Sequence, residues 1–162
     1  MTSPSSPSLL SPHFTLAELT RSEAATRMGL DNTPSPDAIV NLRALCEKVL
    51  EPLRVAIGKP LRVNSGYRGP LANTAVGGSN TSQHSKGEAA DIEVDGMDNM
   101  ALAKKIIELK LPVDQLIAEF VDADRPGSGW IHVSHKRSGP QRGQVLRAVA
   151  LKGKTAYLPG LE

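Results

Sequence analysis

Two short segments, about forty residues apart, place the strongest constraint on how this chain can fold. The first spans residues 63–92 and contains His84 and Asp91 seven residues apart, with Gly87 between them. The second reads WIHVSH and contains His132. Two histidines and one aspartate form the set that a catalytic zinc ion requires, provided that a fourth position is left to water. A fold that serves this chemistry must bring both segments together.

The local pattern predicts how these residues are presented. His84 lies in a predicted loop, and the following strand, residues 89–94, carries Asp91. The chain must turn back between them, and glycine at 87 permits the positive φ that such a turn needs. Residues 130–134 alternate as a strand, so that His132 shares one face with Trp130 and Ser134 while the apolar residues between them face the core.

Composition is typical of one globular domain. The chain has 162 residues, 40% of them hydrophobic and 22% charged, which suffices for a single core. The net charge of +2 comes with no basic run carrying interleaved aromatics, so we expect no nucleic-acid partner. The single cysteine, Cys46, lies among leucines at helical spacing and is predicted to be a buried thiol. Nothing in the pattern requires a second subunit, and we expect a monomer.

The first residues contain no basic start followed by an apolar run, so no secretory signal peptide is predicted. No apolar stretch reaches the length of a membrane span. We therefore expect synthesis in the cytoplasm, and any action outside it would require release or delivery.

Periodicity predicts an α+β fold, with N-terminal helices packed on a small, mostly antiparallel sheet that carries the zinc site. Residues 1–12 are rich in serine and proline and are predicted to be disordered, and residues 13–162 form a single domain. Thr15 and Glu18 form a capping-box pattern that predicts a short helix. A long helix is predicted over residues 37–58, with a kink or an end near Pro52 and a stop at Gly58. Predicted strands cover residues 59–65, 89–94, 115–121, 130–134 and 145–151.

The segment SQHSKGEAAD, preceded by SGYR and followed by WIH, resembles the zinc D-Ala-D-Ala carboxypeptidase family. The wider group includes VanX-type dipeptidases and hedgehog-like domains, and the resemblance extends in particular to its phage-type, peptidoglycan-cleaving branch. The resemblance runs from Phe14 to about Leu158. It implies one zinc ion bound by His84, Asp91 and His132, and cleavage of a peptide bond in the stem peptide of the cell wall.

The same resemblance suggests substrate-binding roles near this site. Arg68 would face the substrate, because a guanidinium offers a fixed fork of donors to a carboxylate or a developing oxyanion. The alternative is a structural arginine that braces the glycine-rich loop. Tyr67 is expected to pack or to orient this loop, and Ser82 to hydrogen-bond within the metal loop, with a substrate contact open for both.

This chain differs from the wider family at the position where many relatives carry the general base. Many relatives carry an acidic residue three positions before the last histidine ligand, where this chain has Gly129. We expect Glu119 to take this role, because it lies on a strand predicted to pair with that of His132 and alternates with Ala118 and Phe120, which would face the core. Asp122 and Asp124 in the hairpin loop are rivals, and the base could also be missing.

Two remaining histidines receive simpler predictions. His135 follows the predicted strand and is expected to be exposed at its end, and His13 is expected on the surface.

These features predict a zinc-dependent peptidoglycan peptidase of carboxypeptidase or endopeptidase type, serving as a phage or prophage lysis or tail enzyme (an endolysin in the first case). The alternative is a non-catalytic, zinc-containing wall-binding or structural virion module, which the glycine at the usual base position motivates.

Overall fold

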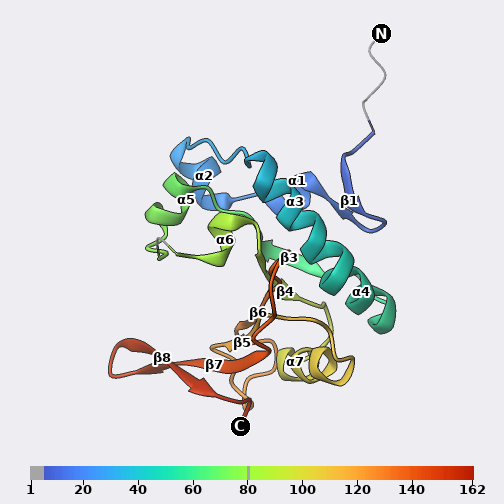
Figure 1. The fold of residues 1–162 in the computed structure, drawn as a ribbon. Coiled ribbons are helices and arrows are strands. Elements are labelled where there is room, and N and C mark those ends of the chain that lie inside the picture. Colours follow the sequence, from blue (N-terminus) through green and yellow to red (C-terminus); the bar gives the residue numbers. More distant parts are fainter. Residues whose placement is uncertain (1–5, 80) are drawn as a thin grey trace.

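The chain begins with helices, as the sequence predicts, and continues into a sheet whose strands are separated by further short helices. The computed structural model describes residues 6–79 and 81–162. A short two-stranded sheet and the N-terminal helices precede a six-stranded sheet with the order β3-β4-β6-β5-β7-β8 (Figure 1). Every neighbouring pair in this larger sheet is antiparallel except β5 and β7. The α+β class is therefore confirmed.

The N-terminus contains more structure than its composition indicates. β1 (Leu9–Ser11) pairs with β2 (Phe14–Thr15), and the side chains of Leu10 and Phe14 are buried. The prediction of disorder up to residue 12 is therefore wrong for β1, because an apolar pair within the serine- and proline-rich stretch packs into the core. Residues 1–5 lie outside the described residues.

Two short helices begin at the capping residues that the sequence provides. α1 (Leu16–Thr20) begins at Thr15, whose side chain accepts a hydrogen bond from the Glu18 amide at 3.1 Å. This confirms the predicted capping box in part. α2 (Glu23–Met28), which was not predicted, is capped by Ser22 and ends at a left-handed Gly29.

The long predicted helix is present in three consecutive parts. α3 (Pro36–Leu45) leads into a π-helical turn, η1 (Cys46–Leu50), and then into α4 (Glu51–Ile57), which ends at a left-handed Gly58. Pro52 has no N–H and its ring crowds the preceding turn, so a wider turn before it relieves the conflict. Cys46 is fully buried, as predicted.

The larger sheet carries the functional part of the chain. Its strands are β3 (Arg62–Ser65), β4 (Ala89–Glu93), β5 (Gln115–Glu119), β6 (Trp130–Ser134), β7 (Gln144–Leu151) and β8 (Lys154–Pro159). The first five overlap the predicted strands, whereas no strand was predicted over β8. Between the strands lie α5 (Pro70–Ala75), α6 (Gln83–Lys86) and α7 (Asn99–Glu108).

The central strands separate an apolar face from a polar face. Ile92, Leu116, Ile131 and Val133 are fully buried, in one cluster with leucines of α3 and α4 and with residues of α7. Alternate residues of the same strands point the other way. No helix of the described residues is long and apolar enough to cross a membrane.

Candidate metal centre

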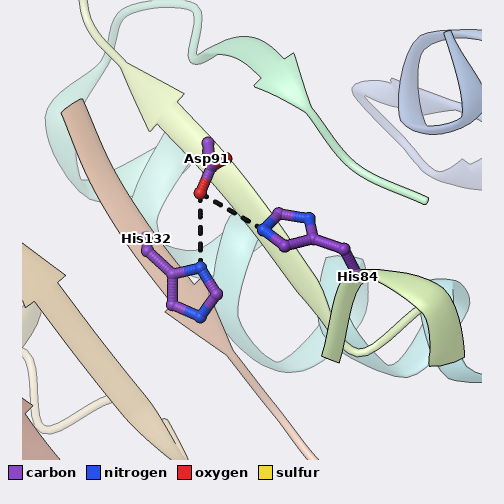
Figure 2. A group of neighbouring side chains, drawn as sticks. All are labelled: His84, Asp91 and His132. Atoms are coloured by element: carbon purple, nitrogen blue, oxygen red, sulfur yellow. Dashed lines mark hydrogen bonds and ion pairs between the residues drawn. The ribbon is translucent and has the colours of Figure 1, made fainter. Parts of the chain in front are cut away.

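His84, Asp91 and His132 come together from three different elements. Asp91 lies on β4, His132 on the neighbouring β6, and His84 on α6 beside them (Figure 2). His84 was expected in a loop but lies in a short helix that ends at Gly87. Within the described ranges this is the one group of three such side chains whose ligand atoms lie close enough to hold a metal ion.

The turn at Gly87 explains how His84 reaches the strand that carries Asp91. Gly87 adopts φ +76°, and a Cβ atom there would lie 2.5 Å from the carbonyl oxygen of Ala38 on α3. Only glycine meets both conditions. The antiparallel register then pairs Asp91 directly with His132. One tight turn and one pair of strands thus bring together the two segments that carry His84, Asp91 and His132.

The geometry fits a tetrahedral zinc ion. Asp91 Oδ1 lies 3.4 Å from His84 Nε2 and 3.3 Å from His132 Nδ1, and all ligand atoms lie within 4.8 Å of one another. A tetrahedral zinc ion with bonds of about 2.0–2.1 Å places its ligand atoms about 3.3–3.4 Å apart. Two neutral imidazoles and a carboxylate are also the donor types that zinc accepts in catalytic sites. The residues present therefore fit zinc.

Hydrogen bonds and nearby charges set the protonation states of His84 and Asp91 that metal binding requires. His84 Nδ1 lies 2.8 Å from the carbonyl oxygen of Gly66, which can only accept, so Nδ1 carries a proton and Nε2 is the atom that can offer a lone pair to a metal ion. Burial of the Asp91 carboxyl opposes its ionisation, but while no metal ion is bound, charge and hydrogen bonds from the His84 and His132 rings hold the pKa of Asp91 well below its usual range. Asp91 is therefore ionised at neutral pH, as a ligand must be.

A cavity of about 750 Å³ surrounds the three side chains. Its walls come from the loop between α5 and α6, from the polar face of the sheet, and from the β7–β8 hairpin that projects from the body in Figure 1. Arg68, Ser82 and Glu119 line it, together with Trp130 and Tyr157. The hairpin wall was not predicted, because the residues around Tyr157 show no local pattern of a strand that returns to the site.

The substrate-binding candidates separate into two groups. Arg68 lines the cavity, and within the described ranges its buried Nε makes no hydrogen bond, which argues against a bracing role. Ser82 lines the cavity and caps α6 by accepting a hydrogen bond from the His84 amide at 3.3 Å. Tyr67 is buried and lies outside the described cavity wall, while its amide donates to the Leu19 carbonyl at 2.7 Å. The structure therefore favours packing for Tyr67.

Glu119, the residue expected to act as the base, lies on the same face of the sheet as His132. It pairs with Trp130, whereas His132 pairs with Ile117, so Glu119 and His132 are diagonal neighbours on one face. Such neighbours lie about 7–8 Å apart, within reach of a long side chain. Burial raises the pKa of Glu119 above its ordinary value; the nearby Asp91 acts in the same direction and His132 opposes it.

Asp122 and Asp124, the alternative candidates for the base, lie in the hairpin loop. Asp122 accepts hydrogen bonds from the Asp124 amide and from Arg125 Nε, both at 2.9 Å, and neither aspartate lines the described cavity. Phe120 was expected in the core, yet it is 37% exposed, adopts φ +54°, and lies with its ring 5.8 Å from that of Trp130. The tight closure of the hairpin turns Phe120 outwards immediately after Glu119.

Gly129, where the wider family was expected to carry its acid, leaves no space for a side chain. It adopts φ +68°, and a Cβ atom would lie 2.1 Å from the Glu119 carbonyl oxygen and 2.7 Å from the carbonyl carbon of Phe120. Both obstacles are backbone atoms, which cannot rotate away. An acidic residue at this position would require a different hairpin.

We expect Gly129→Ala to lower the free energy of unfolding by about 2–5 kcal/mol, the sum of a left-handed alanine and an overpacked site. Gly127→Ala is the matched control: its φ is +83°, but nothing lies within 4 Å of the added Cβ. It should therefore lose only about 1–2 kcal/mol. Urea unfolding of both variants measures the difference, and equal losses would show that the contact at Gly129 is unimportant.

The remaining histidines differ from each other. His13 is exposed, as predicted, and its Nδ1 pairs with Glu51 at 2.7 Å. His135 was predicted to be exposed, and this is wrong: it is 7% exposed, and its Nδ1 donates to the carbonyl oxygen of Pro112 at 2.7 Å. The segment before β5 covers His135, and no local sequence pattern indicates that contact.

Comparison with known proteins agrees with this geometry. The sequence profile of the Peptidase M15 family matches residues 12–134, a range that includes all three metal-binding candidates. The chain is also 35% identical, over 95 residues, to the zinc D-Ala-D-Ala carboxypeptidase of Streptomyces albus G. That alignment covers 57% of this chain and 35% of the relative, so the chain spans about a third of the relative's length. The family profile covers well over half of the sequence, and the chain therefore belongs to the Peptidase M15 family.

Proposed function

We propose that this protein is a zinc-dependent peptidase that hydrolyses a peptide bond in the stem peptide of peptidoglycan. The observation that carries the proposal is a single cavity that holds the three metal-binding candidates together with Glu119 and Arg68. Membership of a peptidase family supports a peptide substrate. The name of the Streptomyces relative supports a D-Ala-D-Ala-type bond.

Each cavity residue has a distinct task in this proposal. When bound, zinc supplies Lewis-acid chemistry, in that it acidifies a water molecule and polarises the carbonyl group under attack. The ionised carboxylate of Glu119 accepts the proton of the attacking water and returns it to the leaving amine. The Arg68 guanidinium faces the cavity and steadies the developing oxyanion or a substrate carboxylate.

The size of the cavity supports a substrate longer than a dipeptide. At about 750 Å³ it lies in the upper part of the range of small-molecule sites. A stem peptide bound across it would place residues on both sides of the scissile bond, as an endopeptidase requires. A role on the cell wall, as a phage or prophage lysis or tail enzyme, is the setting we propose, and it rests on the motif resemblance.

The second candidate is a zinc-containing module that binds the wall or supports a virion without cutting. Gly129 favours it, because the hairpin excludes an acid from that position. Glu119 on the cavity wall favours the enzyme, since it supplies a carboxylate from the neighbouring strand. We therefore place the enzyme first.

Digestion of purified peptidoglycan by the zinc-loaded protein tests this proposal. We expect new fragments by mass spectrometry that disappear with a chelator and return when zinc is restored. A synthetic pentapeptide ending in D-Ala-D-Ala, assayed in parallel, distinguishes the specificities: release of free D-Ala indicates a carboxypeptidase, and internal cleavage an endopeptidase. Binding to the wall by folded, zinc-loaded protein without any fragment would overturn the enzyme in favour of the module.

A further inference from the structure

Gln83 connects the candidate metal centre to a charged group buried beneath it. Its side-chain Oε1 lies 3.4 Å from His132 Nε2, the ring nitrogen that faces away from Asp91. Its Nε2 donates to Asp114 Oδ2 at 2.9 Å. Gln83 is thus the link between a metal-binding candidate on β6 and a carboxylate at the start of β5.

The Asp114 carboxylate is held in place by hydrogen bonds and nearby positive charges. It is fully buried, and Arg142 donates to it from its backbone N at 2.9 Å and from Nη2 at 2.6 Å. Lys136 Nζ lies 3.4 Å away. Hydrogen bonds from Arg142 hold the pKa of Asp114 well below its usual range. Asp114 is therefore ionised and offers only acceptors.

The negative charge of Asp114 determines how the Gln83 amide is oriented between Asp114 and His132. Because Asp114 accepts only, Gln83 must turn its NH₂ group towards it, and its carbonyl oxygen then faces His132. A carbonyl oxygen accepts only, and a neutral His132 that gives its Nδ1 lone pair to zinc carries its proton on Nε2, where Gln83 can accept it. This leaves the lone pair on Nδ1, the atom 3.3 Å from Asp91 Oδ1. The buried charge thereby selects the metal-binding tautomer through one amide.

The rings of His84 and His132 are therefore oriented by different kinds of hydrogen-bond partner. His84 is oriented by a backbone carbonyl, that of Gly66, which no side-chain substitution removes. His132 relies on a side chain. Partners of this second kind, behind a metal ligand, affect metal affinity by about 10- to 100-fold.

We propose that Gln83 is a positioning residue that, anchored by Asp114, fixes the ring orientation and tautomer of His132 for metal binding. This rests on the proposed function only in that the site binds zinc. Gln83 touches neither substrate nor reacting atoms in this role and acts through His132.

Gln83→Met tests the proposal, because methionine preserves length and volume but cannot donate to Asp114 and offers His132 only a weak sulfur acceptor. We expect zinc affinity, measured by competition with a chromophoric chelator, to fall by about 10- to 100-fold. Gln83→Asn keeps an amide that is one methylene too short to bridge both partners and should show the same loss. Long-range ¹H–¹⁵N spectra of the zinc-bound wild type should place the His132 proton on Nε2, and this signal should weaken in both variants.

Gln115→Met is the matched control. Gln115 lines the same cavity, but its side chain bonds to Gln144 at 2.7 Å. It should bind zinc as the wild type does. Zinc affinities of Gln83→Met and Gln83→Asn within about threefold of wild type, with thermal unfolding showing folded protein, would overturn the role of Gln83. Failure of the wild type to bind zinc would instead overturn the metal centre itself, so the two failures are distinguishable.

Discussion

His132→Ala is expected to abolish stoichiometric zinc binding and to lower kcat/KM by about 1,000- to 100,000-fold. The variant removes one of three ligand side chains from the centre, and the Lewis-acid contribution of a catalytic metal amounts to several kcal/mol, with about 1.4 kcal/mol for each tenfold in rate. Because His132 lies on a strand whose neighbours Ile131 and Val133 remain in the core, the fold should persist. Elemental analysis of the purified variant and its rate of peptidoglycan hydrolysis measure both effects.

His135→Asn is the control for this variant. It alters a buried histidine just beyond the same strand, one that bonds to the Pro112 carbonyl and does not belong to the metal-binding group. It should keep full zinc content. A His132→Ala protein that still binds one equivalent of zinc with wild-type affinity would contradict the assignment of this ligand.

Glu119→Gln is expected to lower kcat by about 100- to 10,000-fold while zinc binding is retained, because the amide cannot accept the proton of the attacking water. The matched change is Asp122→Asn, in the hairpin loop, where the carboxylate pairs with Arg125. It should leave kcat close to wild type. The reverse pattern, with activity lost in Asp122→Asn and kept in Glu119→Gln, would reassign the base.

The same variant has an expected effect on stability. Burial raises the pKa of Glu119 in the folded state, so the charged form is disfavoured by folding at pH values above that pKa. A neutral glutamine removes this cost, and Glu119→Gln should be at least as stable as wild type at neutral pH. Denaturant unfolding of zinc-free proteins measures it, and a clear loss of stability would indicate that the carboxylate has a structural partner. Loss of activity with retained stability is typical of a catalytic group.

The sequence predicted those parts of the fold that depend on local pattern. The long helix follows from apolar residues at intervals of three and four, and its start at Pro36 and stop at Gly58 follow from backbone preferences. The grouping of His84, Asp91 and His132 was also predictable, because glycine at 87 and strand alternation restrict where these side chains point.

The parts that were missed depend on contacts between distant segments. β1 forms because Leu10 finds the core, and β8 because it pairs along β7. His135 is buried by a carbonyl 23 residues earlier. Gln83 showed no signal beyond its place beside His84, since its partners lie 31 and 49 residues away. Such pairings depend on tertiary packing, which local propensity does not encode.

The division of β6 into a core face and a cavity face affects how the sequence of this protein can evolve. Ile131 and Val133 stabilise the molecule from one face, while Trp130 and His132 line the cavity on the other. Side chains on opposite faces of a strand contact different neighbours, so a substitution on the cavity face leaves the packing of the apolar face in place. Selection can therefore alter the cavity wall, and with it the choice of substrate, while the apolar face keeps the protein above its folding threshold.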